Sequence, residues 1–97
     1  MTSAPRTFAK IRAERDLARR HGFTPCRVAS SGMRRAYVRP GARVWQDGDA
    51  WVGAAIDMGG HYAHRSRFRD LASACGHAEF AAAAIAAASR AAVFNRR

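Results

Sequence analysis

The chain has few of the residues that build a large hydrophobic core or a disulfide framework. Leucine, isoleucine, valine and phenylalanine together number fifteen of 97 residues, and the only cysteines are Cys26 and Cys75. Highly charged chains in which these four residues fall below roughly 20% approach the composition of disordered proteins. Alanine, with twenty-three residues, fills the gap but buries little surface. The deficit predicts a marginally stable domain that gains from association with a second copy or another partner.

Signals for secretion and membrane insertion are also lacking. The first ten residues contain no apolar stretch of the kind found in signal peptides, and the longest nearly uncharged run, 80–89, is too short to span a bilayer. Two cysteines without such a leader indicate reduced thiols. We therefore expect a cytoplasmic protein without a membrane partner.

Acidic residues are scarce, and lysine almost absent. Seven Asp and Glu stand against seventeen Lys and Arg, giving a formal net charge of +10, and Lys10 is the only lysine. The planar guanidinium of arginine suits phosphate and carboxylate oxygens, and a basic excess raises encounter rates with polyanions. A GC-rich coding bias, which favours both Ala and Arg, is the alternative explanation. The charge predicts an acidic partner: nucleic acid, a nucleoprotein complex or an acidic protein surface.

Turn residues and hydrophobic periodicity predict one α+β domain over 1–97, with 1–6 and 95–97 frayed. The expected order is an N-terminal helix, a three-stranded antiparallel sheet and one or two C-terminal helices, in two layers. Gly22 ends the first helix, and a loop with at most a short strand near Arg27 follows. Ser66 caps a short helix over 67–75, and Gly76 ends it. The expected elements are a helix over 6–21, strands over 33–39, 42–46 and 50–58, and helices over 67–75 and 78–95.

The two tryptophans are predicted to lie on opposite faces of the sheet. An Asp-Gly dipeptide between two hydrophobic runs favours a two-residue hairpin, in which we expect Trp45 to pair with Ala50. Trp45 then shares a face with Ile56, and Val44 shares the other with Trp51. We place the C-terminal helix on the Trp45 face, which leaves Trp51 more exposed. The alternative is that the N-terminal helix covers Trp51.

This order of elements resembles that of the double-stranded-RNA-binding domain. That family contacts phosphates across the RNA groove, with clustered lysines at the start of its second helix. The corresponding stretch here, 77–84, contains neither lysine nor arginine. We therefore assign no membership in the family.

A basic and aromatic surface is the main candidate site. On a regular strand Arg35, Tyr37 and Arg39 project from the same side, while Arg34 and Arg43 point to the other. Arginines interleaved with exposed aromatic rings are typical of single-strand binders. The predicted partner-binding residues are Arg35, Arg39, Tyr37, Trp51, Arg34, Arg43, Arg12, Arg15 and Arg19.

Histidine and cysteine provide a weaker pattern. His61, His64, Cys75 and His77 are of the types that bind zinc, but no cysteine pair anchors a site, so we expect no metal and no cofactor. The two loop histidines lie beside Asp57 and a Gly-Gly turn, an arrangement compatible with general acid–base cleavage of RNA. No ordered catalytic motif accompanies them.

These observations leave three functions open. The first is a non-enzymatic module that binds nucleic acid or a nucleoprotein complex. The second is an inhibitor or adaptor of the phage or mobile-element type, which binds a host complex such as a nucleic-acid-guided defence system. The third is a small RNA-cleaving toxin. The apolar stripe from Phe80 to Phe94 also predicts a homodimer through the last helix.

Overall fold

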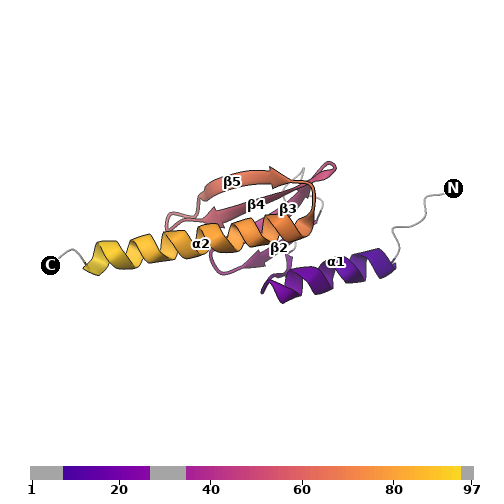
Figure 1. Cartoon of the computed structure of the whole chain (residues 1–97), viewed down its shortest axis with the longest axis horizontal. Coiled ribbons are helices and arrows are strands. Elements are labelled where there is room, and N and C mark those ends of the chain that lie inside the picture. Colours follow the sequence, from indigo (N-terminus) through magenta and orange to yellow (C-terminus); the bar gives the residue numbers. More distant parts are fainter. Residues whose placement is uncertain (1–7, 27–34, 95–97) are drawn as a thin grey trace.

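The computed structural model describes residues 8–26 and 35–94, which form two helices and one five-stranded antiparallel sheet (Figure 1). The α+β class and the terminal helices agree with the prediction, whereas the expectation of three strands is wrong. The elements are α1 (Phe8–Arg20), β1 (Thr24–Cys26), β2 (Ala36–Arg39), β3 (Ala42–Asp47), β4 (Ala50–Ile56), β5 (Tyr62–Phe68) and α2 (Leu71–Phe94).

The sheet is a simple meander in the order β1-β2-β3-β4-β5. Gly41 and Gly48 make two of the tight turns with φ values of 80° and 65°, a region that favours glycine. Asp47 pairs with Ala50, so the β3–β4 loop starts one residue later than predicted and Trp45 pairs with Val52 instead of Ala50. The prediction that the two tryptophans lie on opposite faces still holds. Ala50 and Val52 are two residues apart and so share a face, and both partners of a pair point to the same side of the sheet.

The predicted short helix over 67–75 is wrong over its first residues, which belong to β5. Phe68 pairs with Trp51, and a register shift opposite Gly53 and Ala55 accompanies a positive φ of 56° at His64. Such an irregularity lets an edge strand bend along its neighbour. Ser66 therefore lies in a strand and caps no helix.

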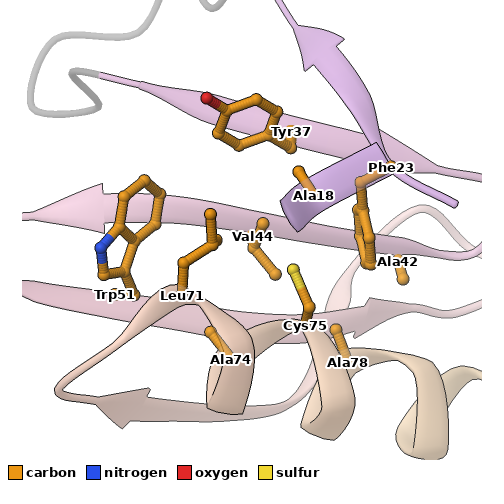
Figure 2. Close-up of a cluster of buried hydrophobic side chains, with 10 residues drawn as sticks. All are labelled: Ala18, Phe23, Tyr37, Ala42, Val44, Trp51, Leu71, Ala74, Cys75 and Ala78. Atoms are coloured by element: carbon orange, nitrogen blue, oxygen red, sulfur yellow. The ribbon is translucent and has the colours of Figure 1, made fainter. Parts of the chain in front are cut away.

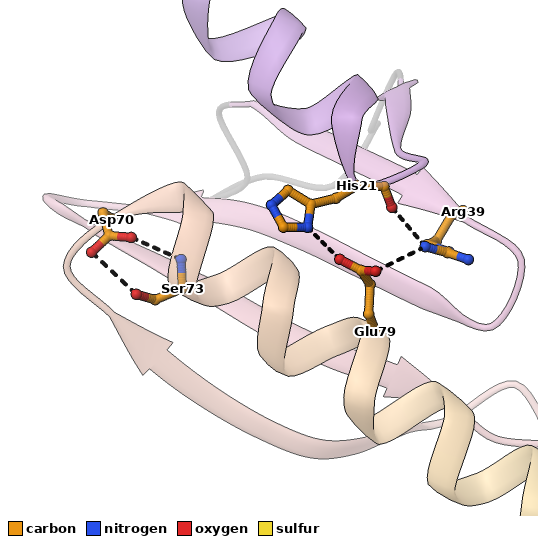
Figure 3. A network of polar contacts seen from close by, with 5 residues as sticks. All are labelled: His21, Arg39, Asp70, Ser73 and Glu79. Atoms are coloured by element: carbon orange, nitrogen blue, oxygen red, sulfur yellow. Dashed lines mark hydrogen bonds and ion pairs between the residues drawn. The ribbon is translucent and has the colours of Figure 1, made fainter.

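Helix α2 runs without interruption where two helices were expected. Asp70 is its N-cap: its Oδ1 accepts a hydrogen bond of 2.7 Å from the Ser73 amide, as Figure 3 shows. Gly76, predicted to end a helix, lies inside α2. At 1.5 Å per residue α2 is about 36 Å long, and its C-terminal turns extend past the strands (Figure 1). The exposed apolar stripe of this helix consists of Phe80, Ala84, Ala87 and Ala91.

Both helices pack on the Trp51 face of the sheet, which corrects the prediction that α2 covers Trp45. Figure 2 shows the cluster, in which α1 provides Ala18 and the start of α2 provides Leu71 and Cys75. Gly53 explains this choice of face, because a Cβ at this position would lie 2.3 Å from the backbone oxygen of Ala74. The absent side chain lets α2 lie directly on β4.

The opposite face has a smaller apolar cluster built only from strand residues: Ala36, Trp45, Val52 and Ala54. The prediction of one tryptophan on each face is therefore confirmed. The predicted difference in exposure is wrong, because Trp51 is 8% exposed and Trp45 is 6% exposed. No described helix contributes to the Trp45 cluster.

Candidate nucleic-acid interface

The predicted strand residues do share one side of β2, but the helices cover that side. Tyr37 is 3% exposed and donates a 2.6 Å hydrogen bond to Oε2 of Glu14 on α1. Burial, reinforced by the bond to this carboxylate, raises the pKa of Tyr37 above its ordinary value. Arg35 places its Nε 2.9 Å from the same carboxylate oxygen. Both residues therefore fasten α1 to the sheet.

Arg39 joins β2 to both helices. Its Nη1 donates a 2.6 Å hydrogen bond to the His21 carbonyl at the end of α1 and lies 3.5 Å from Oε1 of Glu79 on α2. The His21 ring contacts the other oxygen of Glu79, which completes the network in Figure 3. The guanidinium also lies over the Phe23 ring, 5.7 Å from its centre. Because the Arg39 guanidinium already makes these internal contacts, it stabilises the fold and is not free to bind a partner.

The predicted binding residues Arg35, Tyr37 and Arg39 therefore make contacts that hold the helices to the sheet. Trp51 and Tyr37 are buried with their ring centres 6.3 Å apart, so neither ring presents a face to a base. The alternative that the N-terminal helix covers Trp51 is right only in part, because the cluster around Trp51 contains Leu71 of α2 as well as Ala18 of α1. Arg34 lies outside the described residues. Sequence periodicity gives the side of a strand but not which side the helices occupy, so these roles required the structure.

The helix half of the prediction forms a coherent exposed surface. Arg12, Arg15 and Arg19 are spaced at i, i+3 and i+7, so they share one face of α1, and all three are exposed. None of the ion pairs among the described residues involves them. Together with Ile11 and Asp16 they line a groove of about 540 Å³. We call Arg12, Arg15 and Arg19 the α1 arginine row.

Arg43 lies on the other sheet face, as predicted, and its aromatic neighbour there is Tyr62. Its Nη1 donates a 2.7 Å hydrogen bond to the hydroxyl of Tyr62, and its guanidinium carbon lies 5.9 Å from the centre of that ring. Tyr62 lies between the strand expected over 50–58 and the helix expected over 67–75, so it belonged to no predicted element. The run 62–68 has no strict alternation of apolar and polar residues, so periodicity gave no strand signal there.

The histidine and cysteine residues take part in local structure. Cys75 is buried in the core under α2, where burial raises the pKa of its thiol to about 12. The ring of His77 lies beside that of Phe68 in a tilted arrangement, with centres 5.2 Å apart, and its Nε2 donates to the His64 carbonyl. Within 8–26 and 35–94 no group of three His, Cys, Asp or Glu side chains is placed to hold a metal ion.

Asp57, the third member of the possible catalytic group, organises a turn. Its Oδ1 accepts hydrogen bonds of 2.9 Å from the amides of His61 and Gly59. These bonds, the one from His61 foremost, lower the pKa of the Asp57 carboxyl. The His61 ring Nδ1 lies 3.6 Å from the same oxygen and is largely exposed. The arrangement is that of an Asx turn between two strands.

Helix α2 also has the length and composition, over Leu71–Ala91, of a segment able to cross a membrane. Helices that pack in a protein core pass the same test, and only 28% of its most apolar window is buried here. Length and composition alone therefore do not establish a membrane location. The exposed positions of this helix include its apolar stripe.

Comparison of the chain with protein-family models, with curated proteins and with solved structures gives no match.

Proposed function

We propose that this chain is a non-enzymatic nucleic-acid-binding module whose primary contact is the α1 arginine row. The observation that carries the proposal is three exposed guanidiniums on one helix face, without a carboxylate partner among the described residues, in a chain of net charge +10. Unpaired arginines are available to phosphates at no cost of breaking an internal ion pair.

The spacing of the row supports a phosphate backbone as the ligand. From Arg12 to Arg19 the helix rises about 10 Å, at 1.5 Å per residue. This equals about three steps of one DNA strand, which rises 3.4 Å per nucleotide. The long side chains let each of the three guanidiniums reach a phosphate within that stretch. Contacts of this kind position a nucleic acid without reading its sequence.

The proposal is tested by the anisotropy of a fluorescein-labelled oligonucleotide titrated with single variants of the row. Arg12→Ala, Arg15→Ala and Arg19→Ala should each weaken binding by a similar factor. Arg90→Ala is the matched control, because Arg90 is exposed near the end of α2 that Figure 1 shows farthest from α1. Asp16→Asn should strengthen binding, since it removes the one negative charge that lines the groove.

Two results would overturn the proposal: no binding by the folded wild-type protein at low salt, or equal losses for the row and for Arg90. A gel of the same samples checks for cleavage. If the wild-type protein cleaves RNA and His61→Ala or His64→Ala abolishes the cleavage, the chain is an RNA-cleaving toxin and the proposal is wrong.

A protein-binding inhibitor or adaptor is the second candidate, favoured by the apolar stripe of α2. Phe80 is 75% exposed, and its neighbours on the stripe are uncharged. An exposed apolar patch of this kind marks interaction surfaces. For a protein partner one or two residues should dominate, each costing about 2 kcal/mol or more, while their neighbours matter little. Bare nucleic acid should then bind poorly.

A further inference from the structure

The sheet face that no described helix covers has a second basic and aromatic surface. Tyr62 on β5 pairs with Ile56 and lies on this face, where its ring centre is 4.8 Å from that of Trp45. The small side chain of Ala54 lies between them on β4, which lets the two rings meet. Trp45 is buried, whereas Tyr62 is 36% exposed. Tyr62 is therefore an accessible ring held in place by a buried one.

Arg43 gives this platform a positive charge. It bonds the Tyr62 hydroxyl, yet no ion pair among the described residues includes it. Its Nε is buried and has no hydrogen-bond partner in the described part of the chain. A half-buried guanidinium with unused donors is costly unless an anion neutralises it.

A groove of about 370 Å³ continues the surface on the other side of Trp45. Val52, Arg65 and Arg67 line it, with Asp47 and Ser66. Nη1 of Arg67 lies 3.6 Å from Oδ2 of Asp47, and both side chains are more than half exposed. Solvent-exposed pairs of this kind contribute little, so a phosphate can replace the carboxylate. Arg65 forms no ion pair with a described residue.

We propose that this face binds single-stranded nucleic acid, with one base stacked on Tyr62 and phosphates held by Arg43 and by Arg65 and Arg67. The inference extends the proposed function and depends on it. Stacking on a side chain requires a base whose face is free, and a duplex hides its base faces within the stack. The α1 arginine row supplies affinity for any nucleic acid, and the Trp45 face supplies preference for a single strand.

The test compares a single strand of about 15 nucleotides with the duplex of the same sequence at one salt concentration. Wild type should bind the single strand more tightly. Tyr62→Leu should weaken single-strand binding about tenfold, the loss expected for one stacked base, and leave duplex binding unchanged. Tyr62→Phe keeps the ring and should stay within about twofold. Phe80→Leu, which removes an exposed ring elsewhere, is the matched control and should have no effect.

Arg65→Ala provides a second variant that leaves the aromatic pair intact. It should flatten the dependence of log affinity on log salt by about 0.7 for the single strand only. Equal binding of the two oligonucleotides, or a folded Tyr62→Leu variant that binds like wild type, would overturn the inference. If binding responds to the α1 arginine row but to neither Tyr62 nor Arg65, only this inference fails. If wild type binds neither oligonucleotide, the proposed function fails as well.

Discussion

Replacing Gly53 by alanine perturbs the closest approach between the sheet and α2. The added Cβ would lie 2.3 Å from the oxygen, 3.0 Å from the carbon and 3.2 Å from the Cα of Ala74. All three are backbone atoms, so no side-chain rotation relieves the clash. An ordinary contact begins near 3.4 Å, so α2 must move away by about 1 Å. That shift separates Leu71 and Cys75 from the sheet and opens the core.

The expected cost is about 1–3 kcal/mol, the usual range for an overpacked core. A chain of 97 residues has a stability of roughly 5–15 kcal/mol, and the thin core places this one near the lower value. The melting temperature should fall by about 4–8 °C for each kcal/mol. Urea denaturation followed by tryptophan fluorescence gives the free energy of unfolding, and circular dichroism gives the melting temperature.

Gly76→Ala is the control, since it makes the same chemical change inside α2, where a Cβ would meet nothing within 4 Å. It should stabilise the protein by about 0.5–1 kcal/mol, because glycine is a poor residue in a helix interior. Opposite signs for the two variants are the prediction. A Gly53→Ala variant as stable as wild type would refute the packing of α2 on β4.

Three further predictions concern α2. Asp70→Ala should lower the melting temperature at neutral pH. The Ser73 bonds lower the pKa of Asp70, so its stabilisation exists above the ordinary value of 3.8 and is lost as the pH falls through the lowered value. The melting temperatures of the two proteins should therefore converge in acid. Cys75 should resist a thiol reagent at about pH 8 in the native state and react in urea, which peptide mass mapping detects; fast native labelling would contradict its burial. Sedimentation should show a concentration-dependent dimer through the apolar stripe of α2, which Phe80→Glu abolishes, and a strict monomer would exclude it.

The sequence predicted features that depend on local chemistry. Gly22 ends α1 with a φ of 83°, the hairpin residues produce the central strands, and period-two alternation separates the two tryptophans. β5 was missed because its exposed positions hold His and Arg, which is usual for an edge strand and typical of a loop in sequence.

The choice of helix-covered face is a tertiary property. It depends on Gly53, whose missing side chain lets α2 pack closely on β4. It also depends on Glu14 of α1, whose carboxylate accepts a hydrogen bond from Tyr37 and pairs with Arg35. No spacing along the chain encodes these contacts. The shared face of the α1 arginine row follows from the sequence alone, because residues at i, i+3 and i+7 lie on one side of a helix. Tyr62 joined a candidate site only when β5 placed it beside Trp45.

The most direct test of the account is the salt dependence of oligonucleotide binding by wild type and by the triple variant Arg12→Ala, Arg15→Ala, Arg19→Ala. For wild type the logarithm of the affinity should fall linearly with the logarithm of the salt concentration. Each lost phosphate contact removes about 0.7–0.9 from the slope, so the triple variant should have a slope shallower by about 2–3. Identical slopes for the two proteins would show that the α1 arginine row is only a solvated helix face and would contradict the proposed function.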